Sequence, residues 1–139
     1  MSQPLTLQQD IISSEIHDLG GVLVYTIEPG IMVSQYYEDV VLDLPLALQI
    51  DELACQLTGC KAVPQLFIAC LGQSVTKEVR DWSASPAATK HTLCTAIVCT
   101  SMAHKILGNF FIKVQKPPRP AKMFSKIEES KEWLISFIQ

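Results

Sequence analysis

The first sixty residues of this chain contain no lysine and no arginine. They carry nine acidic residues, whereas residues 61–139 hold all eleven basic residues and the other five acidic ones. One expectation is that the opposite charges of the two halves attract each other within one globule. The other is that oppositely charged faces meet between copies of the chain or attract a charged partner. The net charge of −3 argues against a nucleic-acid partner, although a basic strip lies between residues 113 and 126.

Long apolar runs and leader sequences are also missing. No stretch of about 18 apolar residues occurs, so we expect no membrane-spanning helix. The first residues, MSQPLTLQQD, lack the basic and then apolar regions of a secretory signal. We therefore expect a cytoplasmic protein.

Known catalytic motifs are absent as well. The chain has no G-x-S-x-G, no phosphate-binding glycine loop and no H-E-x-x-H. Ser101 and His104 lie one helical turn apart, but a helix cap with a neighbouring histidine accounts for them. Glu78 and Asp81 are best interpreted as a solvated helix face. We expect no catalytic residue, no enzyme activity and no cofactor.

Five cysteines make an odd number with irregular spacing. This favours reduced thiols over a disulfide framework, and Cys70, Cys94 and Cys99 lie in or beside apolar runs. Cys55 and Cys60 both fall near the end of an expected helix. A C-x4-C pair without a second pair is a weak zinc signal. We expect no metal site, and the role of this pair stays open.

What is present is enough for one compact domain. The chain has 139 residues, 48% of them hydrophobic, which excludes disorder. Residues 22–28 and 31–37 are β-branched and aromatic around Pro29-Gly30, which predicts a hairpin. Next comes a helix, with Asp43 as its N-cap and Gly59 as its stop.

The rest of the chain alternates between strands and helices. The continuously apolar run at 65–71 predicts a strand covered on both faces, and a helix from Lys77 to about Ala84 follows it. A strand at 92–100 leads into a long helix capped by Ser101, then a proline-rich connector and a short strand at 123–124. For the long helix we predict a core stripe of Ala103, Ile106, Leu107, Phe110 and Val114.

The last helix is predicted to open with a capping box. Ser125 and Glu128 have the S-x-x-E spacing of that motif. The element order is thus β-β-α-β-α-β-α-β-α, an α/β (α+β) fold whose mixed sheet has a leading antiparallel hairpin and parallel later strands. Residues 1–20 form an N-terminal arm or an extra strand, and residues 21–139 form a single domain.

Three stretches point to a known family. They are SVTKEVRDWSAS after the middle strand, SMAHKILGNFFIKVQKPPRP, and KMFSKIEESKEWL at the end. With the element order, they resemble the SpoIIAA-like branch of the STAS domain family, small bacterial proteins of STAS/SEC14 type. The resemblance covers roughly residues 20–139 and implies a regulatory protein that binds a partner protein.

The family's phosphorylatable serine motif is not matched in this chain. Lys77-Glu78-Val79-Arg80 stands where that motif is expected, and Ser74 and Thr76 lie earlier. Whether either hydroxyl is phosphorylated stays open, with helix capping as the simpler interpretation. We predict a non-catalytic interaction module, a homodimer, with a surface formed by Gln73, Ser74, Thr76, Lys77, Glu78, Arg80, Phe111 and Ile112.

A second hypothesis comes from the SEC14-like side of the resemblance. It implies a carrier or sensor of a small apolar or acyl ligand. The ligand would lie between the sheet and the helices that bear Trp82 and Phe110. The sequence does not identify the protein partner, the ligand or the pathway.

Overall fold

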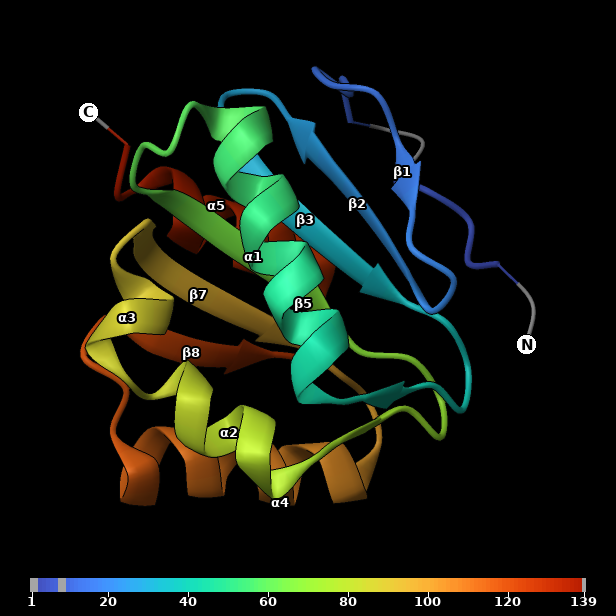
Figure 1. The fold of residues 1–139 in the computed structure, drawn as a ribbon, viewed down its shortest axis with the longest axis vertical. Helices are drawn as coiled ribbons and strands as arrows, with labels where there is room; N and C mark the ends of the chain where they lie inside the picture. Colours follow the sequence, from blue (N-terminus) through green and yellow to red (C-terminus); the bar gives the residue numbers. More distant parts are fainter. Residues whose placement is uncertain (1–2, 8–9, 139) are drawn as a thin grey trace.

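A six-stranded sheet forms the centre of the structure, with helices on both of its faces (Figure 1). The computed structural model describes residues 3–7 and 10–138, so the expectation for residues 1–20 lies partly outside the described residues. The strands are β1 (His17–Asp18), β2 (Val22–Ile27), β3 (Ile31–Tyr36), β4 (Val41–Leu42), β5 (Val63–Ile68), β6 (Ser74–Val75), β7 (Thr92–Val98) and β8 (Ala121–Phe124). The helices are α1 (Leu44–Thr58), α2 (Lys77–Ser83), α3 (Pro86–Thr89), α4 (Met102–Phe110) with its π-helical extension η1 (Phe111–Gln115), and α5 (Ile127–Ile135).

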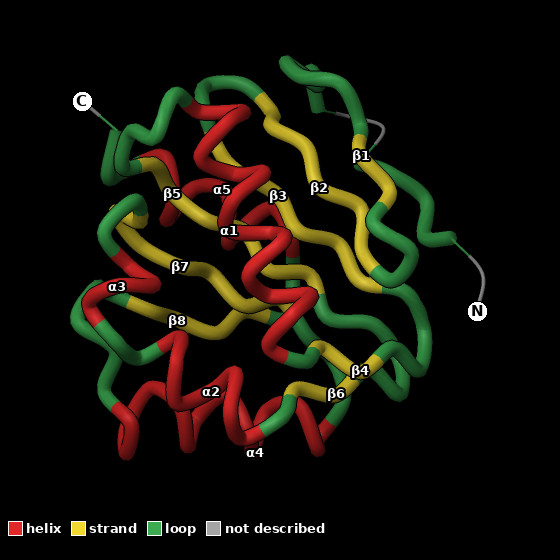
Figure 2. The backbone as a smooth tube through the Cα atoms, in the orientation of Figure 1, coloured by secondary structure: helices red, strands yellow, loops and turns green. Residues whose placement is uncertain are grey.

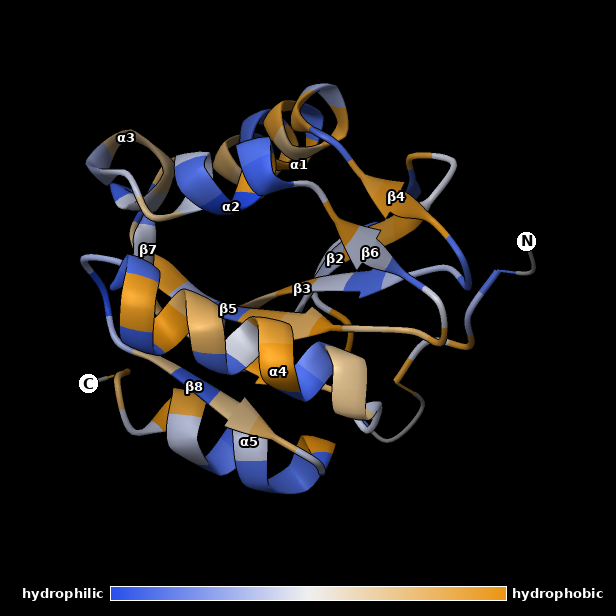
Figure 3. Ribbon diagram, turned by 90° about the horizontal axis from the view of Figure 1, so that it is seen from below, coloured by the Kyte–Doolittle hydropathy of each residue, from blue (hydrophilic) through white to orange (hydrophobic). Residues whose placement is uncertain are grey.

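The sheet has the mixed topology that the element order predicts. Its strand order is β1-β2-β3-β5-β7-β8. The first three strands are antiparallel neighbours, and from β3 onward every pairing is parallel. Parallel neighbours need crossover connections, which the helices supply. Figure 3 shows the resulting layers, with α1, α2 and α3 above the sheet, α5 below it and α4 beside β8.

The predicted hairpin is confirmed, and the N-terminal arm extends it. Every residue of β2 is buried, and β3 pairs with it from Val22–Tyr36 to Ile27–Ile31. The short β1 pairs antiparallel with the outer edge of β2 through His17. The described part of the arm thus lies along the hairpin as an additional edge strand (Figure 2).

The caps of α1 are as predicted. Asp43 adopts an extended backbone, and its Oδ1 accepts a hydrogen bond from the amide of Leu46 at 3.1 Å. At the other end Gly59 has a φ of 67°, the left-handed conformation that glycine adopts at little cost. The sequence signals for this helix are local, which is why its bounds can be predicted.

The two middle strands, β5 and β7, are less buried on one face than expected. Burial alternates along β7, and in β5 Pro64 and Leu66 are buried while Gln65 and Phe67 are half-buried. The buried face packs against α5, where Leu134 is completely inaccessible. The other face lies under α1 and α2 but is not filled by their side chains.

The predicted core stripe of the long helix is wrong. Ile106, Phe110 and Val114 are 62%, 47% and 61% exposed, and Ala103 is exposed too; of the predicted stripe, only Leu107 is half-buried. The helix has apolar residues on two adjacent stripes, so its periodicity does not say which stripe packs inward. The outer one, here called the α4 stripe, consists of Met102, Ile106, Phe110 and Val114.

Gly108 explains why the helix faces this way. It is buried, and a Cβ atom at this position would collide with the thioether of Met123 in β8. The glycine therefore brings α4 close to the edge strand of its own sheet.

The start of α5 also departs from prediction. Lys126, not Ser125, occupies the N-cap position, and no side chain caps the helix. Glu128 and Glu129 lie in the first turn, where negative charge favours the positive end of the helix dipole. No helix in the described part of the chain is both long and apolar enough to cross a membrane.

Candidate functional site

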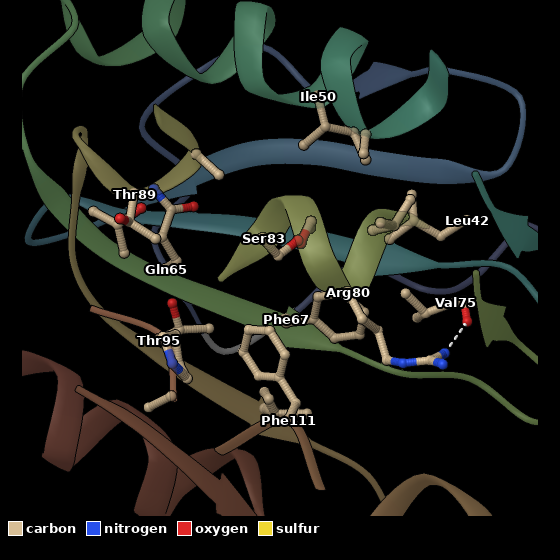
Figure 4. Close-up of a pocket in the computed structure, with 18 of the residues that line it drawn as sticks. Leu42, Ile50, Gln65, Phe67, Val75, Arg80, Ser83, Thr89, Thr95 and Phe111 are labelled. Atoms are coloured by element: carbon tan, nitrogen blue, oxygen red, sulfur yellow. Dashed lines mark hydrogen bonds between the residues drawn. The ribbon is translucent and has the colours of Figure 1, made fainter. Parts of the chain in front are cut away.

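A cavity of about 240 Å³ lies on the half-filled face of the sheet. Its floor is formed by alternate side chains of the middle strands, among them Gln65, Phe67 and Thr95, which Figure 4 labels. Side chains of α1, α2 and α3 form the opposite wall, and Phe111 closes one side. Most of the lining is apolar, and the cavity is open to solvent on one side.

Aromatic side chains shape the floor of the cavity. The rings of Tyr36 and Phe67 pack at 4.4 Å between centroids, on neighbouring strands. Complete burial raises the pKa of the Tyr36 phenol, so this group stays neutral. Trp82 of α2 lines the same cavity. The sheet thus offers an apolar surface on which a ligand can lie flat.

The loop before α2 positions the polar side of the cavity. Ser74 and Thr76 donate backbone hydrogen bonds to the carbonyls of Val40 and Leu42, which ties this loop to the segment after the hairpin. Thr76 then caps α2, its hydroxyl accepting from the amide of Val79 at 3.2 Å. The two-stranded sheet of β4 and β6 was not predicted from the sequence.

Arg80 is a charged residue of the cavity lining on this side. It lies in the last turn of α2, and its Nη1 donates to the carbonyl of Val75 at 2.7 Å (Figure 4). Its Nε is buried and has no hydrogen-bond partner among the described residues. A guanidinium has five N–H donors, so this residue retains capacity to bind an anionic group.

Gln73 and His104 form the neighbouring polar contact. The Nε2 atom of His104 and the carbonyl of Gln73 are 2.5 Å apart. Ser101 caps α4 by accepting from the amide of His104 at 3.4 Å. The hydroxyl and imidazole noted in the sequence are therefore engaged in capping and in holding α4 against the loop.

Asp51 and His91 also line the cavity. Burial raises the pKa of the Asp51 carboxyl above its ordinary value, and the charges of His91 and Lys90 oppose that rise. Arg119 is the exposed member of the lining and marks the mouth of the cavity. Among the described lining residues, Arg80, Arg119, His91 and His104 are basic and Asp51 is acidic.

The structure divides the surface predicted for a protein partner. Gln73, Arg80 and Phe111 line the cavity. Lys77 and Glu78 are exposed on the outside of α2, where Lys77 pairs with Asp81 at 2.7 Å. The remaining predicted residues are Ser74, which is exposed, Thr76, which caps α2, and Ile112, which is half-buried.

The alternative ligand residues are also separated. Trp82 lines the cavity, but Phe110 lies on the outer face of α4, and Phe111 occupies the inner position. Gln65 and Thr95 were not predicted from the sequence. Their signal is a polar residue within a strand that is otherwise mostly apolar.

The cysteines fall into two groups. Cys55 and Cys60 form a disulfide, against the expectation that the thiols are reduced. Cys94 and Cys99 are buried, and burial raises the pKa of Cys94 to about 11, so its thiol is unreactive at neutral pH. Cys70 is free and half-buried.

Comparison with known structures defines the fold. The chain resembles the crystal structure of an uncharacterized protein of the DUF3478 family with a SpoIIAA-like fold from Shewanella loihica PV-4. The TM-score is 0.51, and the match covers 96% of this chain and 98% of that one at 16% identity. The protein therefore has the SpoIIAA-like α/β fold that the sequence predicted.

The family follows from the sequence itself. A family model described as "Domain of unknown function (DUF7793)" matches residues 25–138, and the chain belongs to this family. No curated protein matches the chain.

Proposed function

We propose that this protein binds a small amphipathic anion, an alkyl chain that ends in a carboxylate, in the cavity between the sheet and helices α1 to α3. The role is that of a carrier or sensor and not of an enzyme. The observation that carries the proposal is a largely apolar cavity lined by Arg80, whose buried Nε has no hydrogen-bond partner among the described residues. Pockets of this kind, with few polar groups among apolar walls, are typical of ligand sites.

The charges around the cavity favour an anion. Arg80 is held by one bond to the carbonyl of Val75, and its remaining donors can reach a carboxylate without moving the helix. Arg119 at the mouth adds a second positive charge. Asp51 is the acidic side chain of the lining, and the charges of His91 and Lys90 act on it.

The volume limits the size of the ligand. A cavity of about 240 Å³ is somewhat smaller than the range of about 300–1,000 Å³ typical of drug-sized ligands. A medium-length alkyl chain suits this space, because its far end can extend through the open side. We therefore take decanoate as the probe.

Binding is expected to follow the charge of the head group. Decanoate, 1-decanol and decylammonium share one alkyl chain, and we expect affinity to fall in that order because only the carboxylate pairs with Arg80. The fluorescence of Trp82 reports binding directly once the other tryptophan is removed by Trp133→Phe, since Trp133 packs against Phe124 and Phe137 on the opposite face. Equal affinity for the three compounds, or none, would contradict the proposal.

Filling the cavity is expected to block the ligand. Thr95→Phe places an aromatic ring on the floor and should weaken decanoate binding by at least about tenfold, because the space for the alkyl chain is lost. Thr100→Phe is the matched control, since Thr100 is exposed and does not line the cavity. Isothermal titration calorimetry measures both. Unchanged binding in the first variant would place the ligand elsewhere.

A specific observation favours a second function, self-association as part of a regulatory interaction. The α4 stripe presents four large apolar side chains at intervals of four residues, three of them more than half exposed. A second copy is the partner that the charges fit, because Lys105 and Lys113 flank the stripe while the first sixty residues are purely acidic. This contact would leave the cavity free.

Charge on the stripe is expected to separate the copies. Wild-type protein should sediment as a dimer at high concentration, and Ile106→Glu should shift it to the monomer, because an unpaired carboxylate would be buried in the contact. Ile135→Glu on α5 is the control, since Ile135 is 40% exposed and lies away from the stripe. A monomeric wild-type protein would exclude this second function and leave the ligand proposal intact.

A further inference from the structure

The end of α1 brings three potential metal ligands together. Cys55 lies in the last turn of the helix, Cys60 follows the left-handed Gly59, and His91 precedes β7. The sulfur atoms of the two cysteines and one ring nitrogen of His91 all lie within 4.8 Å of one another. The histidine is separated from the cysteines by thirty residues of sequence, so the C-x4-C pair alone did not reveal this cluster.

The backbone holds these residues in place on both sides. The amide of Cys60 donates to the carbonyl of Cys55 at 2.8 Å, and the left-handed φ of 58° at Cys60 turns the chain back toward the helix. The amide of Val63 donates to the carbonyl of His91 at 3.1 Å, which fixes the histidine beside the same turn. The cluster is therefore preorganised by main-chain contacts that do not involve the sulfur atoms.

The donor set selects a class of metal. Zinc binds cysteine sulfur at about 2.3 Å and histidine nitrogen at about 2.0–2.1 Å in a tetrahedron, which brings such ligand atoms within about 4 Å of one another. Thiolate and imidazole ligands suit Zn²⁺ and similar soft or borderline ions, and they disfavour Mg²⁺ and Ca²⁺. Because Cys55 and His91 are half-buried and Cys60 is exposed, a fourth position remains accessible to water.

We propose that the reduced chain binds Zn²⁺ through Cys55, Cys60 and His91, and that the disulfide and the metal-bound form exclude each other. Binding requires both thiols to lose their protons and His91 to be neutral. A small-molecule disulfide then oxidises the pair by two exchange steps. The two thiolates form the Cys55–Cys60 bond, the two electrons pass to the oxidant, which leaves as two thiolates, and Zn²⁺ departs with its charge unchanged.

The proposed metal site is distinct from the cavity proposed to bind the ligand. His91 also lines the cavity, but neither Cys55 nor Cys60 does. The proposal revises the expectation that the chain has no metal site, which rested on the cysteine pair alone. It also gives the pair a role that differs from that of the buried Cys94 and Cys99.

Cobalt is a direct probe of this site, because thiolate ligands give Co²⁺ intense charge-transfer bands in the near ultraviolet. We expect reduced protein to bind one Co²⁺ with such bands and to release it when Zn²⁺ is added. Protein oxidised with glutathione disulfide should bind none, and renewed reduction should restore binding. Reduced protein without stoichiometric binding would overturn the proposal.

Single substitutions identify the ligands. Cys55→Ser, Cys60→Ser and His91→Asn should each weaken Co²⁺ binding by more than about tenfold. Cys70→Ser is the matched control, because Cys70 is a free, half-buried thiol outside the cluster. An equal loss in this control, or full affinity in His91→Asn, would contradict the three-ligand site.

A measurement on the unmodified chain covers the case in which a variant fails to fold. Zn²⁺ should slow the alkylation of Cys55 and Cys60 by iodoacetamide in the reduced protein, with no effect on Cys70, as followed by peptide mass spectrometry. Alkylation rates that do not depend on Zn²⁺ would equally overturn the proposal. Decanoate titration of the same samples tests the ligand function separately, so failure of one leaves the other measurable.

Discussion

Arg80→Met is expected to weaken decanoate binding by about 2 kcal/mol or more, on the order of thirtyfold. Methionine keeps the apolar stem of the side chain as far as the position of Nε, so most of the cavity wall contributed by Arg80 remains. What is removed is the cation that would pair with the carboxylate, in a place where Nε is already shielded from water. Calorimetric titration with decanoate measures the loss.

The loss of decanoate affinity should come from the removed charge of Arg80 and not from a change in the shape of the cavity. Affinity for 1-decanol should therefore stay nearly constant in Arg80→Met. Arg119→Met is the matched control, since Arg119 is exposed at the mouth and surface charge pairs contribute only about 0–1 kcal/mol. An equal loss for the alcohol would show that Arg80 supports the cavity wall instead, through its bond to Val75.

Lys131→Met is expected to lower the free energy of unfolding by about 3–5 kcal/mol. The Lys131 ammonium forms an ion pair with the carboxylate of Asp10, and these side chains are only 19% and 7% exposed. Without the lysine, a carboxylate would remain buried without its charge partner, which is costly because the protein interior solvates charge poorly. Urea denaturation followed by circular dichroism measures the difference.

A double variant tests whether the loss of stability comes from the charge that is left unpaired. Asp10→Leu combined with Lys131→Met removes both charges and should recover most of the lost stability, because two apolar side chains can replace a buried pair. Lys126→Met is the control, since Lys126 is exposed before α5. If the single and double variants lose the same free energy, the N-terminal arm does not pack against α5 as described.

This ion pair also bears on the uneven charge of the chain. Asp10 belongs to the purely acidic first sixty residues and Lys131 to the basic remainder. Their contact is one case in which opposite halves attract each other within one globule, the first of the two expectations. The second, attraction between copies, stays a prediction that the Ile106→Glu experiment addresses.

Local chemistry explains which elements could be predicted. The hairpin, the helix from Asp43 to Gly59 and the Thr76 and Ser101 caps each depend on residues within a few positions of one another. The capping box at Ser125 has the same local character and still failed. A capping box describes hydrogen bonds that its residues are able to form. The start of α5 is set instead by the packing of the helix against the sheet, in which Ser130 and Leu134 are inaccessible.

The orientation of α4 could not be read from the sequence. Apolar residues lie on both stripes of this helix, so burial of either satisfies the periodicity. The choice depends on Met123, which packs on Gly108 from a strand fifteen residues further along the chain. The same contact turns Phe111 inward and leaves Phe110 outside. Phe111 therefore occupies the position beside the cavity that we had predicted for Phe110.

The sequence by itself determined the order of the elements and most helix ends, because these follow from hydrophobic periodicity and from turn and cap residues close together in the chain. The SpoIIAA-like fold was implied by the resemblance of three stretches, with that element order, to a known family. Only the tertiary structure decided where space remains unfilled and which distant side chains meet. The cavity around Arg80 and the cluster of Cys55, Cys60 and His91 both arise between elements that are remote in sequence. Such juxtapositions depend on the packing of whole helices against the sheet, and no short stretch of residues encodes them.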